Sequence, residues 1–258
     1  MTENPAPNLH VVSLEYILLS NERVIYKNPP PIEFETDEAL FHLADGVLKC
    51  KMKERFSDAV AARKVVEPIL RAWEVDTDLG HNRGELRFKY KMAEVIDLSP
   101  APSGSVTAKV VGNAMLSATG TLSTHDTRSR YPEPPPDHFR LNPDAESILL
   151  RYEGYLGGRE PLPAMAYFCL TLLEGKAGGR GKAVAMYGIH RDVLSKIGKL
   201  STQRGDLQSA RKASATQPLS GAESAWLEEA MKTLVRRLGD TRSPASLRVV
   251  SMTDLPKL

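Results

Sequence analysis

Hydrophobic and polar residues alternate in two segments of the first hundred residues. In Gly46–Arg55, Leu48, Cys50 and Met52 alternate with three lysines, and Glu85–Met92 repeats the pattern. A period of two residues is typical of a strand with one buried and one solvated face. Shorter β-branched or aromatic runs, bounded by Asn, Ser or Pro, predict further strands. These are His10–Leu19, Arg23–Lys27 and Ile32–Thr36, with a hairpin in Val106–Thr124.

Each alternating segment places three cations on its solvated face. In the second segment we expect Leu86, Phe88, Tyr90 and Met92 on the buried face. If the two strands were neighbours, their cations could form a basic plate for nucleic acid. Like charges directly opposite each other destabilise a sheet by up to about 1 kcal/mol per pair, however. We therefore favour a sheet in which Glu33 and Glu35 of another strand pair with lysines, and the basic plate stays the alternative.

A helical period interrupts the strands after residue 56. Ser57 is a favourable N-cap, and an apolar stripe follows it. The stripe consists of Ala62, Val65, Val66, Ile69, Leu70 and Trp73. Pro68 should kink this helix or divide it, because proline has no N–H to donate. We expect a β-rich α+β domain at residues 1–127, with six or seven strands and one helix.

A proline-rich segment separates this domain from the rest of the chain. Pro132 and Pro134–Pro136 favour an extended polyproline conformation and cannot join a sheet ladder. We interpret residues 128–142 as a stiff linker, with a docking site for a proline-binding partner as the alternative. Residues 143–258 are then a second domain. The predicted fold class is α+β, with an all-α helical bundle at the C-terminal end.

The last 120 residues have the period of helices. Asn142 and Pro143 begin the first of them, and Pro163–Glu174 is apolar all round, which is typical of the most buried helix of a bundle. Gly175–Lys182 should be a loop. Val184–Leu200 should form one helix, or two that are separated at Gly188.

The last helix is the most strongly indicated. Ser220 and Glu223 form a capping box, and Gly239 ends the helix. Its apolar positions have helical spacing. They are Ala222, Trp226, Leu227, Ala230, Met231, Leu234, Val235 and Leu238.

Composition limits the compartment. The chain has two cysteines, Cys50 and Cys169, in apolar surroundings, so a disulfide framework is excluded and a reducing compartment is favoured. The first ten residues lack the basic and apolar parts of a signal peptide. The longest uncharged apolar run, Pro161–Leu173, has 13 residues, whereas a bilayer requires about 20. We expect a bacterial cytoplasmic protein without a membrane partner.

Charge is distributed unevenly along the chain. The formal net charge is +2, but residues 1–100 carry 13 Lys and Arg against 17 Asp and Glu, and residues 151–258 carry 17 against 10. Between Lys176 and Lys212 there are nine basic residues and two acidic ones. Such a local excess attracts phosphate groups. The candidate anion-binding or nucleic-acid-binding residues are Arg180, Lys182, Arg204, Arg211 and Lys212.

No catalytic motif stands out. GKAGGRGK (175–182) lacks the glycine register and the Ser or Thr of a phosphate-binding loop. Asp76, Asp78 and His81 lie close together in sequence, but polar turn chemistry explains them better than a metal site, so we expect neither metal nor cofactor. Segment 180–199 can be aligned with a DNA-binding helix-turn-helix, although a packed helical hairpin explains it equally well.

Four segments resemble a family of uncharacterised bacterial two-domain proteins. They are YPEPPP (131–136), GREPLPAMAYFCLTLLE (158–174), RGDLQSARKA (204–213) and WLEEAMKTLVRR (226–237). This resemblance brings no known activity. The C-terminal half also resembles HEPN domains, which are helical bundles of RNases, toxins and antiviral systems. Their signature is Arg, four to six residues, then His, whereas here Arg204 is followed by Arg211 in place of the histidine. The resemblance implies RNA or anion binding, and the missing histidine argues against RNase activity.

Three hypotheses follow for the function. The first is a non-enzymatic, nucleic-acid-associated protein, with a role in defence or stress, whose helical domain binds RNA or DNA phosphates. The second is an interaction or scaffold module that binds a protein partner or forms a homodimer. The third is an atypical HEPN-like RNase that uses Arg204 and Asp206. The sequence leaves open the ligand, the oligomeric state and the biological trigger.

Overall fold

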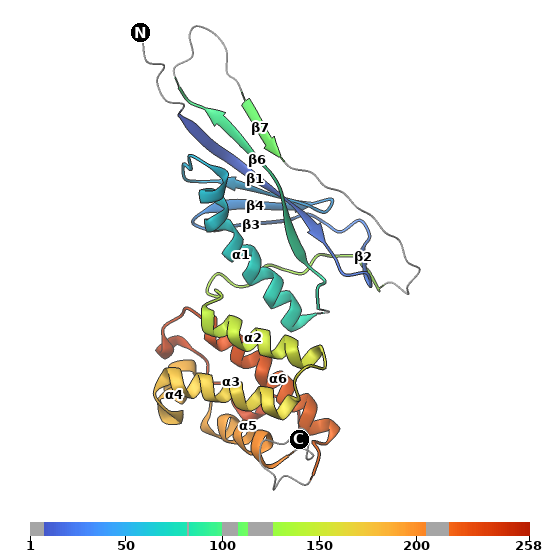
Figure 1. Ribbon diagram of the computed structural model, residues 1–258, viewed down its shortest axis with the longest axis vertical. Helices are drawn as coiled ribbons and strands as arrows, with labels where there is room; N and C mark the ends of the chain where they lie inside the picture. Colours follow the sequence, from blue (N-terminus) through green and yellow to red (C-terminus); the bar gives the residue numbers. More distant parts are fainter. Residues whose placement is uncertain (1–7, 82, 100–107, 113–125, 205–216) are drawn as a thin grey trace. The chain divides into compact units, whose positions relative to one another are not determined.

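A computed structural model describes residues 8–81, 83–99, 108–112, 126–204 and 217–258. The chain divides into two compact units, Met1–Asp137 and His138–Leu258. The described residues combine an N-terminal antiparallel sheet with helices α1–α6 (Figure 1). None of these helices is long and apolar enough to span a membrane.

Six strands of the first unit form one antiparallel sheet. They are β1 (Leu9–Leu19), β3 (Ile32–Glu35), β4 (Ala39–Ala44), β5 (Val47–Met52), β6 (Arg87–Asp97) and β7 (Ala108–Gly112). Their order across the sheet is β3-β4-β5-β1-β6-β7. Two short strands, β2 (Val24–Tyr26) and β8 (Asp126–Arg128), pair in parallel beside it. The two alternating segments of the sequence are therefore strands β5 and β6, as predicted.

Helix α1 (Ala59–Gly80) packs against one face of this sheet, over β1 and β6 (Figure 1). Its N-cap is Asp58, which accepts a hydrogen bond from the Ala61 N–H at 2.8 Å, so the prediction of Ser57 was wrong by one residue. We predicted that Pro68 would kink or divide this helix, and the division is wrong, because α1 is a single helix of 22 residues. Pro68 lies on its exposed side, and the opposite side packs into the core.

Strand β1 separates the two lysine-rich strands, so the basic plate does not form. Three lysines of this unit pair with glutamates instead, in line with the arrangement that we favoured from the sequence. Lys49 lies 3.6 Å from Glu94, Lys91 lies 3.3 Å from Glu15, and Lys53 lies 2.5 Å from Glu35. Glu33 departs from the prediction, because its partner is His42 at 2.9 Å.

An irregularity in the pairing of β1 with β6 places Met92 on the face opposite to the one that we predicted. Tyr16 pairs with Tyr90 and Glu15 pairs with Met92, so Lys91 is an extra residue between them. Directly opposite residues of two strands share a face. Met92 therefore lies on the face of Glu15, not on that of Tyr90 as the alternation predicted. A bulge of this kind depends on the partner strand, which the local pattern does not contain.

The start of the proline-rich segment packs into the first unit. Tyr131 is buried, and its hydroxyl accepts a hydrogen bond from the Gly46 N–H at 3.0 Å. The indole N–H of Trp73 donates to the Pro132 carbonyl at 3.1 Å. Glu133, Pro136 and Asp137 are exposed.

The second unit contains the remaining helices. They are α2 (Pro143–Leu156), α3 (Leu162–Ala177), α4 (Arg180–Tyr187), α5 (Arg191–Gln203) and α6 (Gly221–Leu238), followed by two short 3₁₀ turns, Pro244–Ser246 and Met252–Asp254. The predicted caps are confirmed: Asn142 accepts from the Asp144 and Ala145 N–H groups, and Ser220 forms a capping box with Glu223.

The predicted loop at 175–182 is wrong in extent. Helix α3 continues to Ala177 and α4 begins at Arg180, which leaves Gly178 and Gly179 between them. Both glycines have positive φ, 74° and 117°, which side chains disfavour. The sequence pattern of α4 and α5 allowed one helix or two, and the structure has two, separated at Gly188.

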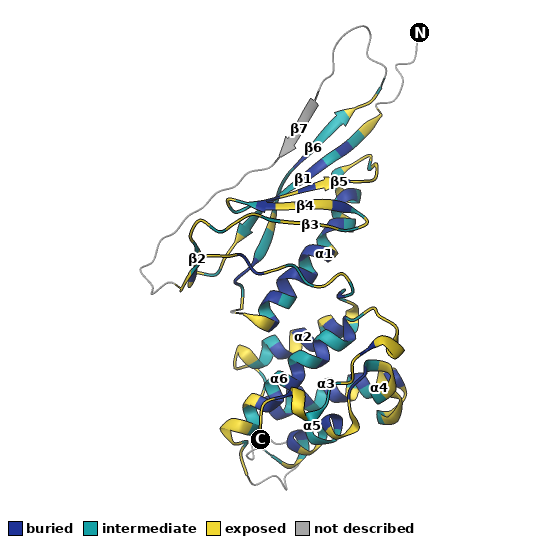
Figure 2. Cartoon of the chain, turned by 180° about the vertical axis from the view of Figure 1, so that it is seen from behind, coloured by how far each residue is buried: buried dark blue, intermediate teal, exposed yellow. Residues whose placement is uncertain are grey.

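Each helix of the second unit buries one side (Figure 2). Met165, Cys169 and Leu173 of α3 are fully buried, as are Trp226 and Met231 of α6. The predicted apolar stripe of α6 is therefore confirmed at its largest residues, and the predicted burial of α3 is confirmed along most of its length.

Candidate functional site

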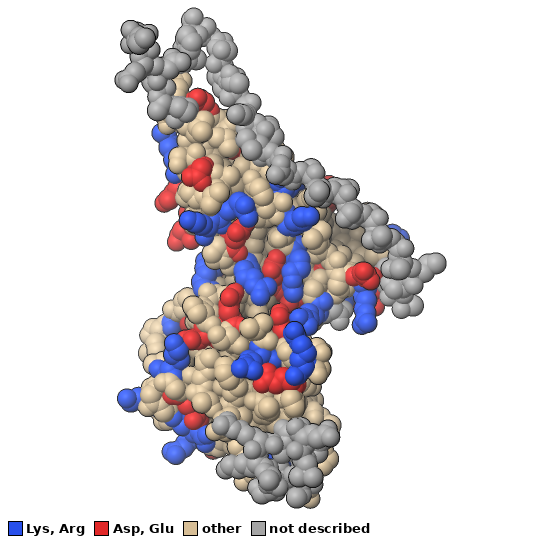
Figure 3. Space-filling model, viewed as in Figure 1, with Lys and Arg blue, Asp and Glu red and all other residues tan. Residues whose placement is uncertain are grey.

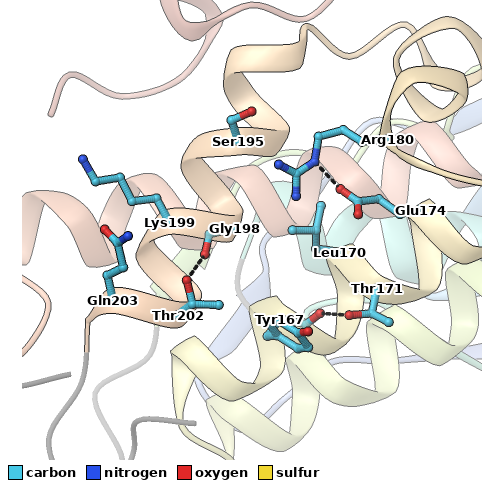
Figure 4. Close-up of a pocket in the computed structure, with 10 residues that line it drawn as sticks. All are labelled: Tyr167, Leu170, Thr171, Glu174, Arg180, Ser195, Gly198, Lys199, Thr202 and Gln203. Carbon is cyan, nitrogen blue, oxygen red and sulfur yellow. Dashed lines mark hydrogen bonds and ion pairs between the residues drawn. The ribbon is translucent and has the colours of Figure 1, made fainter. Parts of the chain in front are cut away.

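A pocket of about 340 Å³ lies between α3 and α5, with the start of α4 at one end (Figure 4). Its lining is mainly polar. It consists of Tyr167, Leu170, Thr171 and Glu174 of α3, Arg180 of α4, and Ser195, Gly198, Lys199, Thr202 and Gln203 of α5. Leu170 is buried and forms an apolar part of the wall.

The turn at Gly178–Gly179 brings Arg180 back toward α3. Its Nε lies 2.5 Å from Oε1 of Glu174, and both side chains are partly exposed. Gly198 makes room for the guanidinium on the α5 side. A Cβ atom at this position would lie 3.2 Å from Nη2 of Arg180 and 3.4 Å from Cδ2 of Leu170. The absence of a side chain at Gly198 therefore keeps this end of the pocket open.

Two of the hydroxyl groups that line the pocket, those of Thr171 and Thr202, have hydrogen-bond partners within the protein. Thr171 Oγ1 donates to the Tyr167 carbonyl at 2.8 Å, and Thr202 Oγ1 donates to the Gly198 carbonyl at 2.7 Å (Figure 4). Both hydroxyls thus bond to their own helix.

Helices α4 and α5 carry three exposed cations and one half-buried cation, which we call the α4–α5 basic face. They are Lys182, Arg191, Lys196 and Lys199. Within the described part of the chain, none of the four has a carboxylate oxygen within 4.0 Å. Figure 3 shows Lys and Arg side chains projecting from the second unit where Figure 1 has α4. Lys199 also lines the pocket, so the basic face and the pocket are continuous.

The basic face follows from the amphipathic pattern of α5. Val193, Leu194, Ile197 and Leu200 form its buried side. Arg191 and Lys199 fall on the opposite arc and are exposed, with Asp192 as an acidic neighbour, whereas Lys196 lies beside the buried side and is half-buried. A helix that buries one stripe leaves its polar residues together on the other, and here most of the charged ones are basic.

The predicted anion-binding residues have different environments. Arg180 lines the pocket, and Lys182 is exposed on α4. Arg204 directly follows α5 and is held by Glu223, with Nη2 and Nε at 3.0 and 3.2 Å from Oε1, and it also donates to Gln217. Arg211 and Lys212 lie outside the described residues. The structure thus has Arg180 and Lys182 on α4, and it pairs Arg204 with Glu223 at the start of α6.

Sequence reasoning missed Tyr167 and Lys199 as site residues. Tyr167 belongs to a helix whose apolar composition indicated only burial. Lys199 was one of nine basic residues, and nothing in its local sequence set it apart. Both become site residues only because α3 and α5 pack side by side.

Two other candidates have structural explanations. The Asp78 carboxylate accepts from the Gly84 N–H at 2.8 Å and pairs with Arg87, so it fixes the turn after α1. Across the described residues, no group of three His, Cys, Asp or Glu side chains could hold a metal ion. Burial raises the pKa of the Cys169 thiol to about 12 and also raises that of Cys50, which keeps both thiols protonated.

Comparisons of the chain with protein-family models, with curated proteins and with solved structures gave no match.

Proposed function

We propose that the second unit, an all-α helical bundle, binds the phosphate backbone of a nucleic acid through the α4–α5 basic face and the adjoining pocket. The observation that carries the proposal is the group of four cations on this face without a carboxylate partner among the described residues. In the first unit Lys49, Lys53 and Lys91 pair with glutamates, whereas Lys51 and Lys89 have no carboxylate oxygen within 4.0 Å among the described residues.

Unpaired cations favour binding to a polyanion for a physical reason. A lysine that pairs with a carboxylate must give up that pair before it contacts a phosphate, whereas no carboxylate of the described residues holds Lys196 or Lys199. Each phosphate contact also releases a condensed counterion, so binding weakens as the salt concentration rises. Contacts to phosphates position a strand without reading its bases, so we expect little sequence preference.

The test is the salt dependence of binding to a labelled single-stranded RNA and to DNA of the same sequence. The logarithm of the affinity should fall linearly with the logarithm of salt over about 50 to 200 mM. The triple variant Arg191→Ala, Lys196→Ala, Lys199→Ala should bind more weakly. Its slope should be shallower by about 0.7 for each lost contact to a single strand.

The matched control removes three cations that have acidic partners in the same unit. Lys232, Arg242 and Arg248 pair with Glu229, Asp240 and Asp254. Their triple alanine variant loses the same charge but should keep most of the slope. Equal effects of the two triple variants would show that net charge alone attracts the ligand. Absence of binding at low salt would overturn the proposal and favour the scaffold hypothesis.

A further inference from the structure

The pocket between α3 and α5 points to a ligand more specific than a phosphate backbone. We infer that it takes one unpaired nucleotide, so that the protein selects single-stranded over double-stranded nucleic acid. This inference rests on the proposed function, because the α4–α5 basic face would hold the rest of the strand.

The size and walls of the pocket suit a nucleotide. Its volume of about 340 Å³ is at the lower end of the roughly 300–1,000 Å³ of small-ligand sites. Tyr167 and the buried Leu170 are the aromatic and apolar residues of its lining, and Lys199 offers a cation for a phosphate beside the Arg180–Glu174 ion pair (Figure 4). Aromatic side chains beside cations are typical of sites that bind single strands, because every base has a face that can stack.

A paired base cannot use this pocket. In a duplex the bases stack on their neighbours and pair with the opposite strand, so a protein reaches their faces only in single-stranded segments. A duplex would therefore contact the α4–α5 basic face through its phosphates and gain nothing from Tyr167.

Glu174 argues against a small free anion as the ligand. Its carboxylate lies 2.5 Å from Nε of Arg180, within the pocket, and partly neutralises that guanidinium. Inorganic phosphate would meet one compensated cation and Lys199. A strand gains the further cations of the basic face, with Lys199 at the junction.

Two variants alter the pocket without altering charge. Tyr167→Leu removes the ring, and its control is Phe168→Leu, because the Phe168 ring lies under Arg151 and outside the pocket. Gly198→Leu fills the space beside Arg180 and Leu170. Its control is Gly181→Leu in α4, where a Cβ would meet no atom within 4 Å. Leucine is a better helix former than glycine, so propensity favours the fold in both glycine variants.

The experiment measures the affinity of each full-length variant for a single strand and for a duplex of the same sequence. The single strand carries 2-aminopurine, whose fluorescence reports stacking. We expect the unaltered protein to prefer the single strand by about tenfold, the lower range of a stacking contribution. Tyr167→Leu and Gly198→Leu should lose this preference and keep the duplex affinity and the salt slope. Phe168→Leu and Gly181→Leu should keep the preference.

Each contrary result has a distinct meaning. Equal affinity of the unaltered protein for single strand and duplex would overturn the pocket inference and leave the phosphate proposal intact. Pocket variants that keep the preference for the single strand would have the same meaning. Competition by inorganic phosphate or by a mononucleotide at the affinity of the strand would assign the pocket to a free anion. Absence of any binding would overturn both proposals. Circular dichroism of every variant checks that a lost preference is not a lost fold.

Discussion

Glu223 has two structural roles at the start of α6. Its carboxylate accepts hydrogen bonds from the Ser220 N–H at 3.0 Å and from Arg204, and its own N–H donates to Ser220 Oγ at 3.1 Å. The hydrogen bond from the Ser220 backbone is the main cause that lowers the pKa of this carboxyl, and Arg204 lowers it further against the opposing effect of burial.

We predict that Glu223→Gln lowers stability at neutral pH. Glutamine keeps the capping box but loses the ion pair with the partly exposed Arg204, which should cost about 0.2–1 kcal/mol. A carboxyl whose pKa is lower in the folded protein stabilises it above the unfolded pKa, and this contribution is lost as the pH falls through the folded pKa. The difference between the two proteins should therefore shrink as the pH falls below the ordinary value of 4.5.

Urea unfolding at several pH values, followed by the fluorescence of Trp226 in a Trp73→Phe background, measures this difference. Arg204→Met is the partner variant for a double-mutant cycle, and its effect should not add to that of Glu223→Gln. A difference that stays constant down to acidic pH would show that the charge of Glu223 contributes nothing.

At this scale the sequence predicted caps and not partners. Ser220 and Glu223 are three residues apart, so their capping box could be found from spacing alone. Arg204 and Glu223 are 19 residues apart, and their contact depends on how α5 and α6 pack. The sequence therefore indicated Arg204 as an anion-binding residue without showing its contacts with Glu223 and Gln217.

Among the elements, α1 departs most clearly from its sequence pattern. Pro68 leaves the Lys64 carbonyl without its normal N–H donor four residues later, and its ring crowds that carbonyl. The helix continues nevertheless, because Val66, Ile69, Leu70 and Trp73 are buried in the core on either side of the proline. Tertiary packing thus outweighs the local cost.

Pro68→Ala should stabilise the first unit by about 1–3 kcal/mol. Alanine restores the hydrogen bond to Lys64 and removes the steric conflict, and the position is exposed, so no packing is lost. Urea unfolding followed by Trp73 fluorescence in a Trp226→Phe background tests this. Pro143→Ala is the control, because proline is favourable in the first turn of α2 and its removal should bring no stabilisation. An unchanged midpoint for Pro68→Ala would mean that α1 has adapted its geometry to the ring.

Strands and helices were predictable to different degrees. Alternation identified β5 and β6, since a half-buried strand imposes period two on any sequence. It could not identify the register shift beside Lys91 or the neighbour of each strand, because both depend on residues far away in the chain. The site has the same limit. Charge indicated Arg180 and Lys182, whereas Tyr167, Gly198 and Lys199 form a pocket only through the packing of α3 on α5.

At the scale of the whole molecule, the chain has one tryptophan in each compact unit, Trp73 and Trp226, and both are fully buried. The hydrogen bonds of the residues around position 135 lie within the first unit or within the second unit. Tyr131 and Pro132 bond to Gly46 and Trp73, whereas the Arg140 N–H donates to the Gly239 carbonyl at 2.8 Å. A cut between Pro135 and Pro136 would therefore leave these hydrogen bonds in place.

We predict that the two units stay folded when the chain is cut there. A specific protease site inserted between Pro135 and Pro136 of the full-length protein allows the cut. The urea midpoints of Trp73 and Trp226, each measured in a single-tryptophan variant, should be the same before and after cleavage, because each core is complete on its own side of the cut. The same site inserted between Gly158 and Arg159 is the control: cleavage there separates α2 from α3 and should lower the Trp226 midpoint alone. Loss of either transition after the cut at residue 135 would show that one unit depends on its covalent link to the other.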